Sequence, residues 1–391
     1  MSGPLQGLRV ADFSQLVQGP SATQFLADMG ADIVKIEPRG GDWSRGWSIR
    51  DCFIKGESLS FLAFNRAKRS ITLNLKAPQG KEIALRIIKS CDVLIENFRP
   101  GVMERLGLGF ETLSQLHPGL IYCASCGWGQ DGPYRERPGQ DLLAQSVAGV
   151  LMLNGTSNDP PLPVGIGVAD LTAALHITIG VLMALYERGR SGKGQRVDIN
   201  LLHSMMHMAT QELTLYLNTL EEPQRSAAGI GHPCVGAPMG VYKTRDGYIS
   251  VAMMPIGKIA ELVGVEGFEG NDSRNVVADR DEVKRKLERG FEKKTTAELM
   301  EIFMAADMWA APVNRFPEVE RDPQVQHNKI IAEFDHPVAG KFRTVAPPTK
   351  FSRTPGEIRR SPLLGEHTDE ILGELGYSQA EIAKFKEDKV V

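Results

Sequence analysis

The stretch GIGVADLTAALHITIGVLMALYERGRSGKGQRVDINLL occupies residues 165–202, and the rest of the chain is organised around it. Residues 171–186 carry no charge, and Leu171, Leu175 and Leu182 recur at helical spacing, which predicts a largely buried helix. This run of sixteen residues is short for a membrane span. A basic, glycine-containing break at 188–194 precedes an alternating segment at 196–201, which predicts a strand.

Asp170 is the one acidic residue at the start of this predicted helix. The simpler interpretation is a helix N-cap, in which the carboxylate accepts backbone N–H groups that lack a partner inside the helix. The alternative is a functional carboxylate at the mouth of an apolar helix. The two roles are compatible, and the remainder of the chain decides whether the second applies.

Composition describes an ordinary globular protein. The 391 residues are 42% hydrophobic and 24% charged, and this length favours two domains. The net charge of −3 gives no broad attraction to nucleic acid or an anionic membrane. No secretory signal is visible, and five scattered cysteines fit a reducing cytoplasm. Cys123 and Cys126 form a single CxxC without a second pair, so we predict no metal site.

The first residues predict a strand–helix–strand unit, with strands at 8–13 and 31–37 and a helix at 22–29. Glu37 ends the second strand at about the distance found in dinucleotide-binding folds. The glycine fingerprint of those folds is missing, however, and Pro20 has no N–H to offer a pyrophosphate. The sequence therefore argues against a nicotinamide cofactor.

The same alternation continues, with strands predicted at 70–75, 91–96 and 119–125 and helices at 78–90 and 106–116. This pattern predicts an α/β fold with a parallel sheet and helices on both faces. Ligands bind such sheets at the carboxyl ends of the strands. Gln18, Arg39, Asn97, Arg99 and the loop 127–133 follow these ends and favour an anionic, phosphate-bearing ligand.

The second half changes in character. A methionine-rich helix is predicted at 204–220, and a hairpin at 239–252 has its turn at Asp246-Gly247. Helices are predicted at 256–263, 280–292 and 296–304, a strand within 341–351, and two terminal helices at 366–375 and 378–387. We therefore expect a large domain at 1–204 completed by 330–391, a linker helix at 205–227, and a smaller α/β domain at 228–325.

An ordered series of motifs covers nearly the whole chain. The motifs are GLRVAD at 7–12, Gly19-Pro20, MGADIVKIE at 29–37, NRAKRS at 65–70, DVLIENFRPG at 92–101, GWGQDGP at 127–133, the Asp170 segment, GKGQR at 192–196 and LGEHTD at 364–369. With this series the chain resembles the family III CoA-transferases, the group of formyl-CoA transferase and carnitine CoA-transferase. The resemblance implies a Rossmann-like large domain that binds coenzyme A, a small inserted domain, and an interlocked homodimer.

The resemblance also makes Asp170 the catalytic nucleophile. It implies transfer of CoA from an acyl-CoA to a free carboxylic acid through an aspartyl anhydride and an aspartyl-CoA thioester. An aspartate has a reference pKa of about 3.9, and a helix N-terminus favours the anion further, so we expect Asp170 to be ionised. Backbone N–H groups of a glycine-bearing loop would hold the oxyanions, and the corresponding segment 236–240 offers Gly236 and Gly240.

Eight residues match the family positions that hold the nucleotide and phosphates of CoA. They are Gln18, Arg39, Leu73, Asn97, Phe98, Arg99, Arg105 and Arg137. Arginine suits phosphate because its guanidinium presents paired donors, and Leu73 would flank the adenine. The expected partners are thus acyl-CoA and small carboxylic acids, with no nucleic acid and no membrane.

Three questions stay open at this stage. A 2-methylacyl-CoA racemase of the same fold is one alternative, but racemases have Gly-His-Asp where this chain has Gly139-Gln140-Asp141, and glutamine cannot shuttle a proton. A non-catalytic CoA-binding subunit is the other. The third question is which carboxylic acids are the substrates, because the sequence does not identify them. The segment 42–47 either lines an acceptor pocket, with Arg45 suited to a dicarboxylate such as succinate, or is a packed surface loop.

Overall fold

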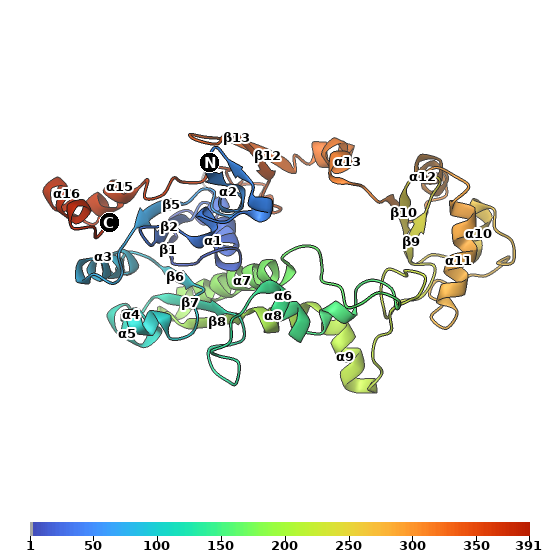
Figure 1. Ribbon diagram of the computed structural model, residues 1–391, viewed down its shortest axis with the longest axis horizontal. Coiled ribbons are helices and arrows are strands. Elements are labelled where there is room, and N and C mark those ends of the chain that lie inside the picture. Colours follow the sequence, from blue (N-terminus) through green and yellow to red (C-terminus); the bar gives the residue numbers. More distant parts are fainter. Residues whose placement is uncertain (1–2) are drawn as a thin grey trace. The chain divides into compact units, whose positions relative to one another are not determined.

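The computed structural model describes residues 3–391 (Figure 1). The chain forms two compact units, which are described separately. The large unit contains the residues up to Ala144 together with Gly167–Met205 and Pro323–Val391. The small unit contains Gln145–Ile166 and Met206–Asp322.

A six-stranded sheet forms the centre of the large unit (Figure 1). Its strands are β1 (Arg9–Asp12), β2 (Asp32–Glu37), β5 (Arg69–Thr72), β6 (Val93–Glu96), β7 (Ile121–Cys126) and β8 (Arg196–Asn200). They lie in the order β5-β2-β1-β6-β7-β8, and every neighbouring pair is parallel. The predicted parallel sheet is therefore confirmed.

Helices cover both faces of this sheet, which explains why the strands are apolar on both sides. Val10 packs with α1 (Gln18–Asp28) and α7 (Val168–Ser191) on one face. The next residue, Ala11, points to the other face. The helices of that second face are α3 (Pro78–Lys89), α4 (Val102–Leu106), α5 (Phe110–Leu116), α15 (Thr368–Glu374) and α16 (Gln379–Glu387).

Several predicted helices differ from the observed ones. The helix predicted at 204–220 is two helices, α8 (Leu201–Met208) and α9 (Thr210–Thr219). The single helix predicted at 106–116 is two helices, α4 and α5, because Gly107 ends α4 in the left-handed conformation with a φ of +76°. The first helix begins at Gln18 rather than at residue 22. Pro20 fits this first turn because its missing N–H would have no partner there.

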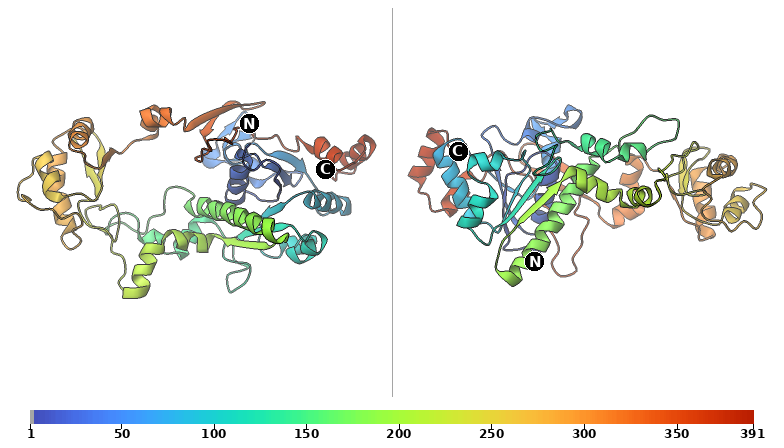
Figure 2. Two further views of the ribbon diagram at one scale, coloured as in Figure 1. Left: turned by 180° about the vertical axis from the view of Figure 1, so that it is seen from behind. Right: turned by 90° about the horizontal axis from the view of Figure 1, so that it is seen from below.

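The central helix α7 is longer than the sequence predicted, with 24 residues. The argument that it is too short to span a membrane is therefore wrong: its mean hydropathy reaches 1.8, and it is the one helix among residues 3–391 long and apolar enough to cross a membrane. Its inner face, which includes Ala174, Ile177 and Val181, packs on α1 and the sheet. Figure 2 shows α7 lying along the strands.

Smaller elements complete the large unit. They are β3 (Phe53–Ile54), β4 (Glu57–Ser58), α2 (Leu59–Phe64), α14 (Pro323–His327), β12 (Ile331–His336) and β13 (Gly340–Val345). Two further helices, α6 (Asp141–Val147) and α8 (Leu201–Met208), begin in the large unit and end in the small one. The antiparallel hairpin of β12 and β13 includes the strand predicted within 341–351, but β12 itself was not predicted.

The small unit is an α/β layer with its own core. Its sheet has the order β11-β10-β9, with β9 (Gly240–Lys243), β10 (Tyr248–Val251) and β11 (Ala310–Pro312) all antiparallel. Its helices are α9 (Thr210–Thr219), α10 (Ile256–Val263), α11 (Arg280–Phe291), α12 (Thr296–Ala305) and α13 (Phe316–Arg321). Phe291 stacks between Tyr242 and Phe303, with ring centroids 4.4 and 5.7 Å apart. The predicted hairpin and the three predicted helices are confirmed.

Candidate active site

The order of the strands reverses between β1 and β6, and ligands bind parallel sheets at the carboxyl ends beside such a point. Asn97, directly after β6, joins the two chain segments that leave these strands. Its Oδ1 accepts from the Gln15 N–H at 2.7 Å, and its Nδ2 donates to the Gln15 carbonyl oxygen at 2.8 Å. The side chain of Asn97 therefore fixes the backbone around which the other predicted contacts lie.

Two cavities open at this edge of the sheet, and Phe98 lines both. The larger cavity, of about 450 Å³, is mostly apolar; Phe13, Ile36, Leu73, Val102 and Leu106 line it, with Arg39 and Lys76 among its polar residues. The smaller, of about 90 Å³, is polar and basic; Gln18, Asn97, Arg99, Arg135 and Arg137 line it. An apolar slot beside a basic one suits a flat base joined to phosphates. Seven of the eight predicted CoA contacts thus lie in these two cavities.

Arg105, the eighth predicted contact, lies on α4 and points its guanidinium at Gly101. A Cβ built on Gly101 would lie 3.0 Å from Arg105 Nη1 and 3.3 Å from Arg135 Nη2. Two guanidinium groups therefore converge on one backbone position, an arrangement that a phosphate between them would stabilise. The sequence analysis missed Arg135, because nothing in the spacing shows that the loop brings it back to α4.

Arg137, by contrast, is engaged within its own loop. Its guanidinium carbon lies 3.8 Å above the centre of the Tyr134 ring, and that ring meets Trp128 edge-on at 5.8 Å. Trp128 in turn donates from Nε1 to the Pro138 carbonyl oxygen at 3.1 Å. Arg137 lines the small cavity, but as part of an aromatic stack rather than as a free cation.

This loop closes on itself at Gly127 and Gly139. A Cβ on Gly127 would lie 2.5 Å from the Gly139 Cα, and one on Gly139 would lie 2.4 Å from the Gly127 Cα. Only glycine fits at either position, since backbone atoms cannot give way. The loop then leads through Gln140 into Asp141, the first residue of α6. The closed loop therefore connects the basic cavity to the acidic residue beside Asp170.

The simpler interpretation of the sequence made Asp170 the N-cap of α7, and this interpretation is wrong. The N-cap is Gly167, which has no side chain to accept a hydrogen bond. Asp141 takes that role from outside the helix: its Oδ2 accepts from the Ala169 N–H at 2.7 Å and from the Asp170 N–H at 3.1 Å. Two carboxyl groups thus share one helix N-terminus.

The acidity of Asp170 differs from the expectation. Burial, together with the charge of Asp141, raises its pKa from 3.8 to about 7. The expected stabilisation of the Asp170 anion by the helix N-terminus is therefore outweighed, although the carboxyl can still ionise at neutral pH. The reason is that the first-turn N–H groups of α7 already serve Asp141. A carboxyl with a pKa near neutrality is a stronger nucleophile, when ionised, than an ordinary one.

The glycines predicted to form an oxyanion loop lie in the small unit. Gly236 is buried and packs directly on the Val276 backbone, and its N–H donates to Asn275 Oδ1 at 2.6 Å. Gly240 begins β9 opposite Val251. The Gly236 donor is therefore engaged in this structure, and the oxyanion role of the two glycines stays a prediction.

Arg45 is not available to a substrate carboxylate. Its Nε and Nη2 donate to the two carboxyl oxygens of Glu37 at 2.6 and 2.9 Å, and its guanidinium lies 3.6 Å above the Phe61 ring. The packed-loop interpretation therefore holds for Arg45. Trp43 and Trp47 stack on each other with centroids 5.5 Å apart, and both remain exposed.

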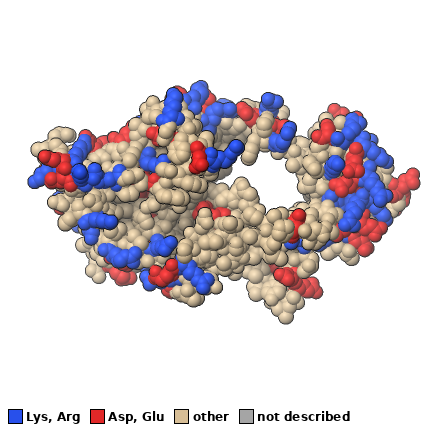
Figure 3. All heavy atoms as spheres, in the orientation of Figure 1, with Lys and Arg blue, Asp and Glu red and all other residues tan. Residues whose placement is uncertain are grey.

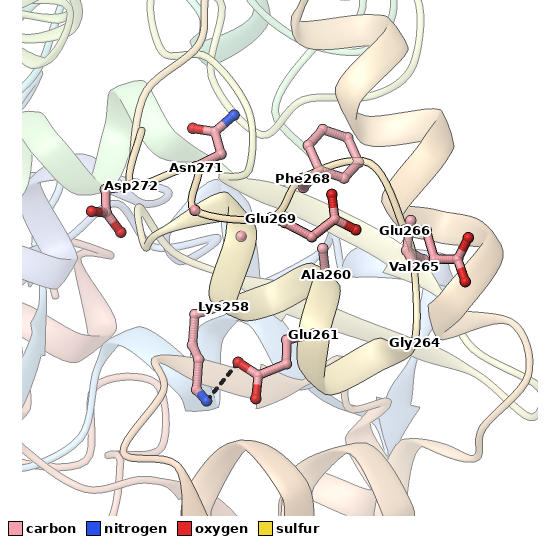
Figure 4. A pocket seen from close by; sticks show the side chains of 12 residues that line it. Lys258, Ala260, Glu261, Gly264, Val265, Glu266, Phe268, Glu269, Asn271 and Asp272 are labelled. Carbon is pink, nitrogen blue, oxygen red and sulfur yellow. Dashed lines mark hydrogen bonds and ion pairs between the residues drawn. The ribbon is translucent and has the colours of Figure 1, made fainter.

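The small unit has a cavity of its own, of about 650 Å³, between α10 and the loop that follows it (Figure 4). Its charged residues are Lys258, Glu261, Glu266, Glu269 and Asp272, and Lys258 pairs with Glu261 at 2.9 Å. This acidic lining would repel a polyphosphate. Among residues 3–391 no cluster of three or more His, Cys, Asp or Glu could hold a metal ion.

Charge on the molecular surface is mixed rather than segregated. On the face shown in Figure 3, basic and acidic side chains are interspersed over both units. Over the whole sequence, 45 Lys and Arg nearly balance 48 Asp and Glu. Recognition of an anion therefore rests on local groups such as Arg99, Arg105 and Arg135 rather than on the charge of the whole protein.

Comparison with known proteins identifies the same family that the sequence motifs resemble. Residues 5–368 match CoA-transferase family III. The chain is 35% identical to a formyl-CoA:oxalate CoA-transferase of Rhodopseudomonas palustris, over 98% of this chain and 96% of that protein. It is 33% identical to the human succinyl-CoA:glutarate CoA-transferase, over 95% and 86% respectively. A solved structure of a CAIB/BAIF family protein from Brucella suis superposes with a TM-score of 0.85 at 32% identity, covering 96% of this chain and 100% of that one.

The family match extends through both units, and it includes the strand ends that line the two cavities and the start of α7. Relatives above 30% identity cover nearly the full chain. This chain belongs to the family III CoA-transferases and is an enzyme of that class.

Proposed function

We propose that this enzyme moves CoA from a donor acyl-CoA to a free carboxylic acid, with Asp170 as the nucleophile. The observation that supports this most is the Asp141–Asp170 pair at the N-terminus of α7. There a half-buried carboxyl with a pKa near 7 lies a short loop away from the basic cavity. Such a group can be ionised at neutral pH and still retain high nucleophilicity.

The first half of the reaction loads CoA onto the enzyme. An Asp170 oxygen attacks the thioester carbonyl carbon of the donor, the C–S bond breaks, and CoA leaves as the thiolate with the bonding electron pair. The thiolate then attacks the Asp170 carbonyl carbon of the resulting anhydride, and the donor acid leaves as its carboxylate. Each step has a good leaving group, so no external energy source is needed.

The second half reverses these steps with the acceptor. The acceptor carboxylate attacks the aspartyl-CoA thioester, which forms a new anhydride and frees the thiolate. The thiolate then attacks the acceptor carbonyl carbon, and Asp170 leaves as a carboxylate. In both covalent intermediates Asp170 is neutral, which relieves its repulsion from Asp141.

For CoA itself we propose that the adenine occupies the apolar cavity beside Leu73 and Phe98. The phosphates would lie against the basic cavity and the pair Arg105 and Arg135. Arg39 lines the apolar cavity and would bind the phosphate nearest the adenine. This assignment keeps all eight predicted contacts and adds Arg135.

Replacing Arg105 by alanine should weaken CoA binding by roughly tenfold to a hundredfold, since a charge-assisted contact to phosphate contributes about 1.5–3 kcal/mol. Arg135→Ala should have an effect of similar size, and the double variant should lose less than the sum, because both groups address one anion. Titration calorimetry with CoA measures this. Arg190→Ala, on the last turn of α7, is the matched control. Unchanged affinity in both single variants would remove the pair from the site.

The two alternative functions have little support from the site. A racemase needs a second acid–base group, and Gln140 beside Asp141 cannot exchange protons at the α-carbon. A non-catalytic CoA-binding subunit would have no use for two carboxyl groups held together at a helix N-terminus. Retention of a 2-methylacyl-CoA configuration after prolonged incubation would exclude racemase activity.

For substrates we propose succinyl-CoA as the donor and a small dicarboxylic acid as the acceptor. The relative named succinyl-CoA:glutarate CoA-transferase supports this choice. The test incubates the protein with succinyl-CoA and a panel of mono- and dicarboxylic acids, and mass spectrometry identifies each new thioester. Transfer only to formate or other monocarboxylic acids would replace this proposal while leaving the transferase assignment intact.

We further propose a homodimer of interlocked chains in the cytoplasm. The outer face of α7 exposes Leu175, Ile179, Met183 and Tyr186, an apolar stripe that a second chain would cover. Light scattering at low micromolar concentration should therefore give twice the 42.9 kDa of one chain. A monomer at that concentration would contradict the proposal. The five free cysteines support the cytoplasmic location.

A further inference from the structure

Glu96 is a buried carboxyl directly beneath the residue that the two cavities share. It is the last residue of β6, and only 6% of it is exposed. Its Oε2 accepts from the Phe98 N–H at 2.8 Å. Since Phe98 lines both the apolar and the basic cavity, this one hydrogen bond acts on the boundary between them.

The surroundings of Glu96 disfavour a negative charge. Glu96, Ala124 and Asp198 are paired in one row across β6, β7 and β8, so the two acidic side chains lie on the same face of the sheet with only the small alanine between them. Glu104 approaches from α4 and Arg196 from β8, but Arg196 already donates to Asp198 Oδ1 at 2.8 Å. Arg196 and the Phe98 N–H favour a charge on Glu96, but burial together with Glu104 and Asp198 outweighs them.

Tyr122 lies in the preceding row of the same sheet face. Its hydroxyl is buried and has no hydrogen-bond partner among residues 3–391. Burial is the largest cause that raises the pKa of Tyr122, and the charges of Glu96 and Glu104 raise it further. This hydroxyl therefore lies close to both carboxyl groups. Glu96 and the Tyr122 hydroxyl are therefore buried, whereas the neighbouring Glu104 and Asp198 are exposed to water.

Burial raises the pKa of Glu96 to about 8, with contributions from Glu104 and Asp198 that exceed the opposing effect of Arg196. The hydrogen bond from the Phe98 N–H also opposes the shift. At pH 7 the carboxyl is consequently protonated and neutral, and it still accepts from the Phe98 N–H.

On the basis of the proposed CoA site, we infer that Glu96 is a positioning residue: its neutral carboxyl holds Phe98 between the two cavities, and loss of its proton releases that turn. The Phe98 N–H alone would bind the ionised carboxylate more tightly, but burial outweighs this bond. Hydration of the anion beside Glu104 and Asp198 requires water to enter at the end of β6. The turn 97–99 moves with it, so the nucleotide loses the wall that Phe98 provides. CoA binding should therefore weaken in alkaline solution.

The test measures binding of adenosine 3′,5′-bisphosphate, the nucleotide half of CoA, by calorimetry between pH 6 and 9. This probe has no thiol, and its phosphates have a second pKa of about 6, so its charge is nearly constant from pH 7 to 9. For the unaltered enzyme the dissociation constant should rise about tenfold from pH 7 to 9, because one group with a pKa near 8 leaves roughly a tenth of the protein competent at pH 9.

Glu96→Gln is the decisive variant, since its amide oxygen accepts the Phe98 N–H but cannot ionise. The ratio of its dissociation constants at pH 9 and pH 7 should be close to one. Glu104→Gln removes a neighbouring charge without touching Phe98, and it should move the pH midpoint of binding downward, because Glu104 raises the pKa of Glu96. Glu96→Ala removes the acceptor and should weaken binding about fivefold even at pH 7.

Equal pH dependence in the unaltered and Glu96→Gln proteins would overturn the inference, as would affinity that does not change between pH 7 and 9 in the unaltered enzyme. A failure of the proposed function gives a different result. In that case neither protein binds the bisphosphate at pH 7, and Arg105→Ala changes nothing, which would remove the CoA site and with it this role of Glu96.

Discussion

Replacing Asp170 by asparagine will lower CoA transfer by roughly 10⁴-fold or more while CoA still binds, because the neutral amide cannot attack a thioester. The change is close to isosteric, so α7 should form as before, and Asp141 will still accept from the first-turn N–H groups. Mass spectrometry of new thioesters measures transfer, and calorimetry with CoA measures binding. Continued transfer by this variant would refute the assignment of Asp170.

Trapping the covalent intermediate tests the role of Asp170 directly. Enzyme mixed with acyl-CoA should carry acyl or CoA groups on Asp170, and hydroxylamine should convert that carboxyl to a hydroxamate. Borohydride should reduce the thioester form and inactivate the enzyme. Peptide mapping then distinguishes the two neighbouring acids. Label on Asp141 rather than on Asp170 would reverse their roles.

The Asp170→Asn variant should also be more stable than the unaltered enzyme near neutral pH. The folded-state pKa of about 7 lies above the reference value of 3.8, so the folded protein holds this proton where the unfolded chain has lost it. The free energy of unfolding therefore falls as pH rises from about 4 to about 7. The variant does not lose this stability, and the difference in the free energy of unfolding at pH 7 should be on the order of 4 kcal/mol. Thermal unfolding at pH 4 and pH 7 measures it.

The sequence predicted a parallel sheet with helices on both faces because both faces of β1, β2, β6 and β7 are buried. Segments such as 31–37 and 91–96 are short, apolar and bounded by turn residues, so local pattern and tertiary position agree. The ends of α7 were harder to predict from the sequence. Val168 and Ala169 before Asp170, and the charged last turn around Arg188, extend the helix beyond its uncharged centre. Charge alone does not end a helix; Gly192 does so in the left-handed conformation.

Some residues of the candidate site could likewise be predicted from the sequence, and others could not. Residues at strand ends, such as Arg39, Leu73 and Asn97, could be placed because parallel strands bring their carboxyl ends to one edge. The convergence of Arg105 and Arg135 depends on how a closed loop folds back, and local sequence does not encode that path. The perturbed acidity of Asp170 likewise depends on a neighbour almost thirty residues away in sequence.

Asp141→Asn should separate the charge of that neighbour from its capping role. The asparagine oxygen still accepts from the Ala169 and Asp170 N–H groups, but the negative charge is gone. The pKa of Asp170 should then fall, because the charge of Asp141 is one of the two causes that raise it. We expect the acid limb of kcat/KM for succinyl-CoA, which lies near pH 7 in the unaltered enzyme, to move down by at least one pH unit.

The maximal rate should fall at the same time, by about tenfold, because a less basic carboxylate is a weaker nucleophile and the neutral intermediates no longer relieve a repulsion. Asp141→Ala is the matched control: it also removes the charge, but it leaves the first-turn N–H groups without their acceptor. It should therefore lose about 1 kcal/mol of stability in addition, visible in thermal unfolding. An acid limb that stays near pH 7 in both variants would show that burial alone sets the acidity of Asp170, and Asp141 would then be a capping residue without a role in the chemistry.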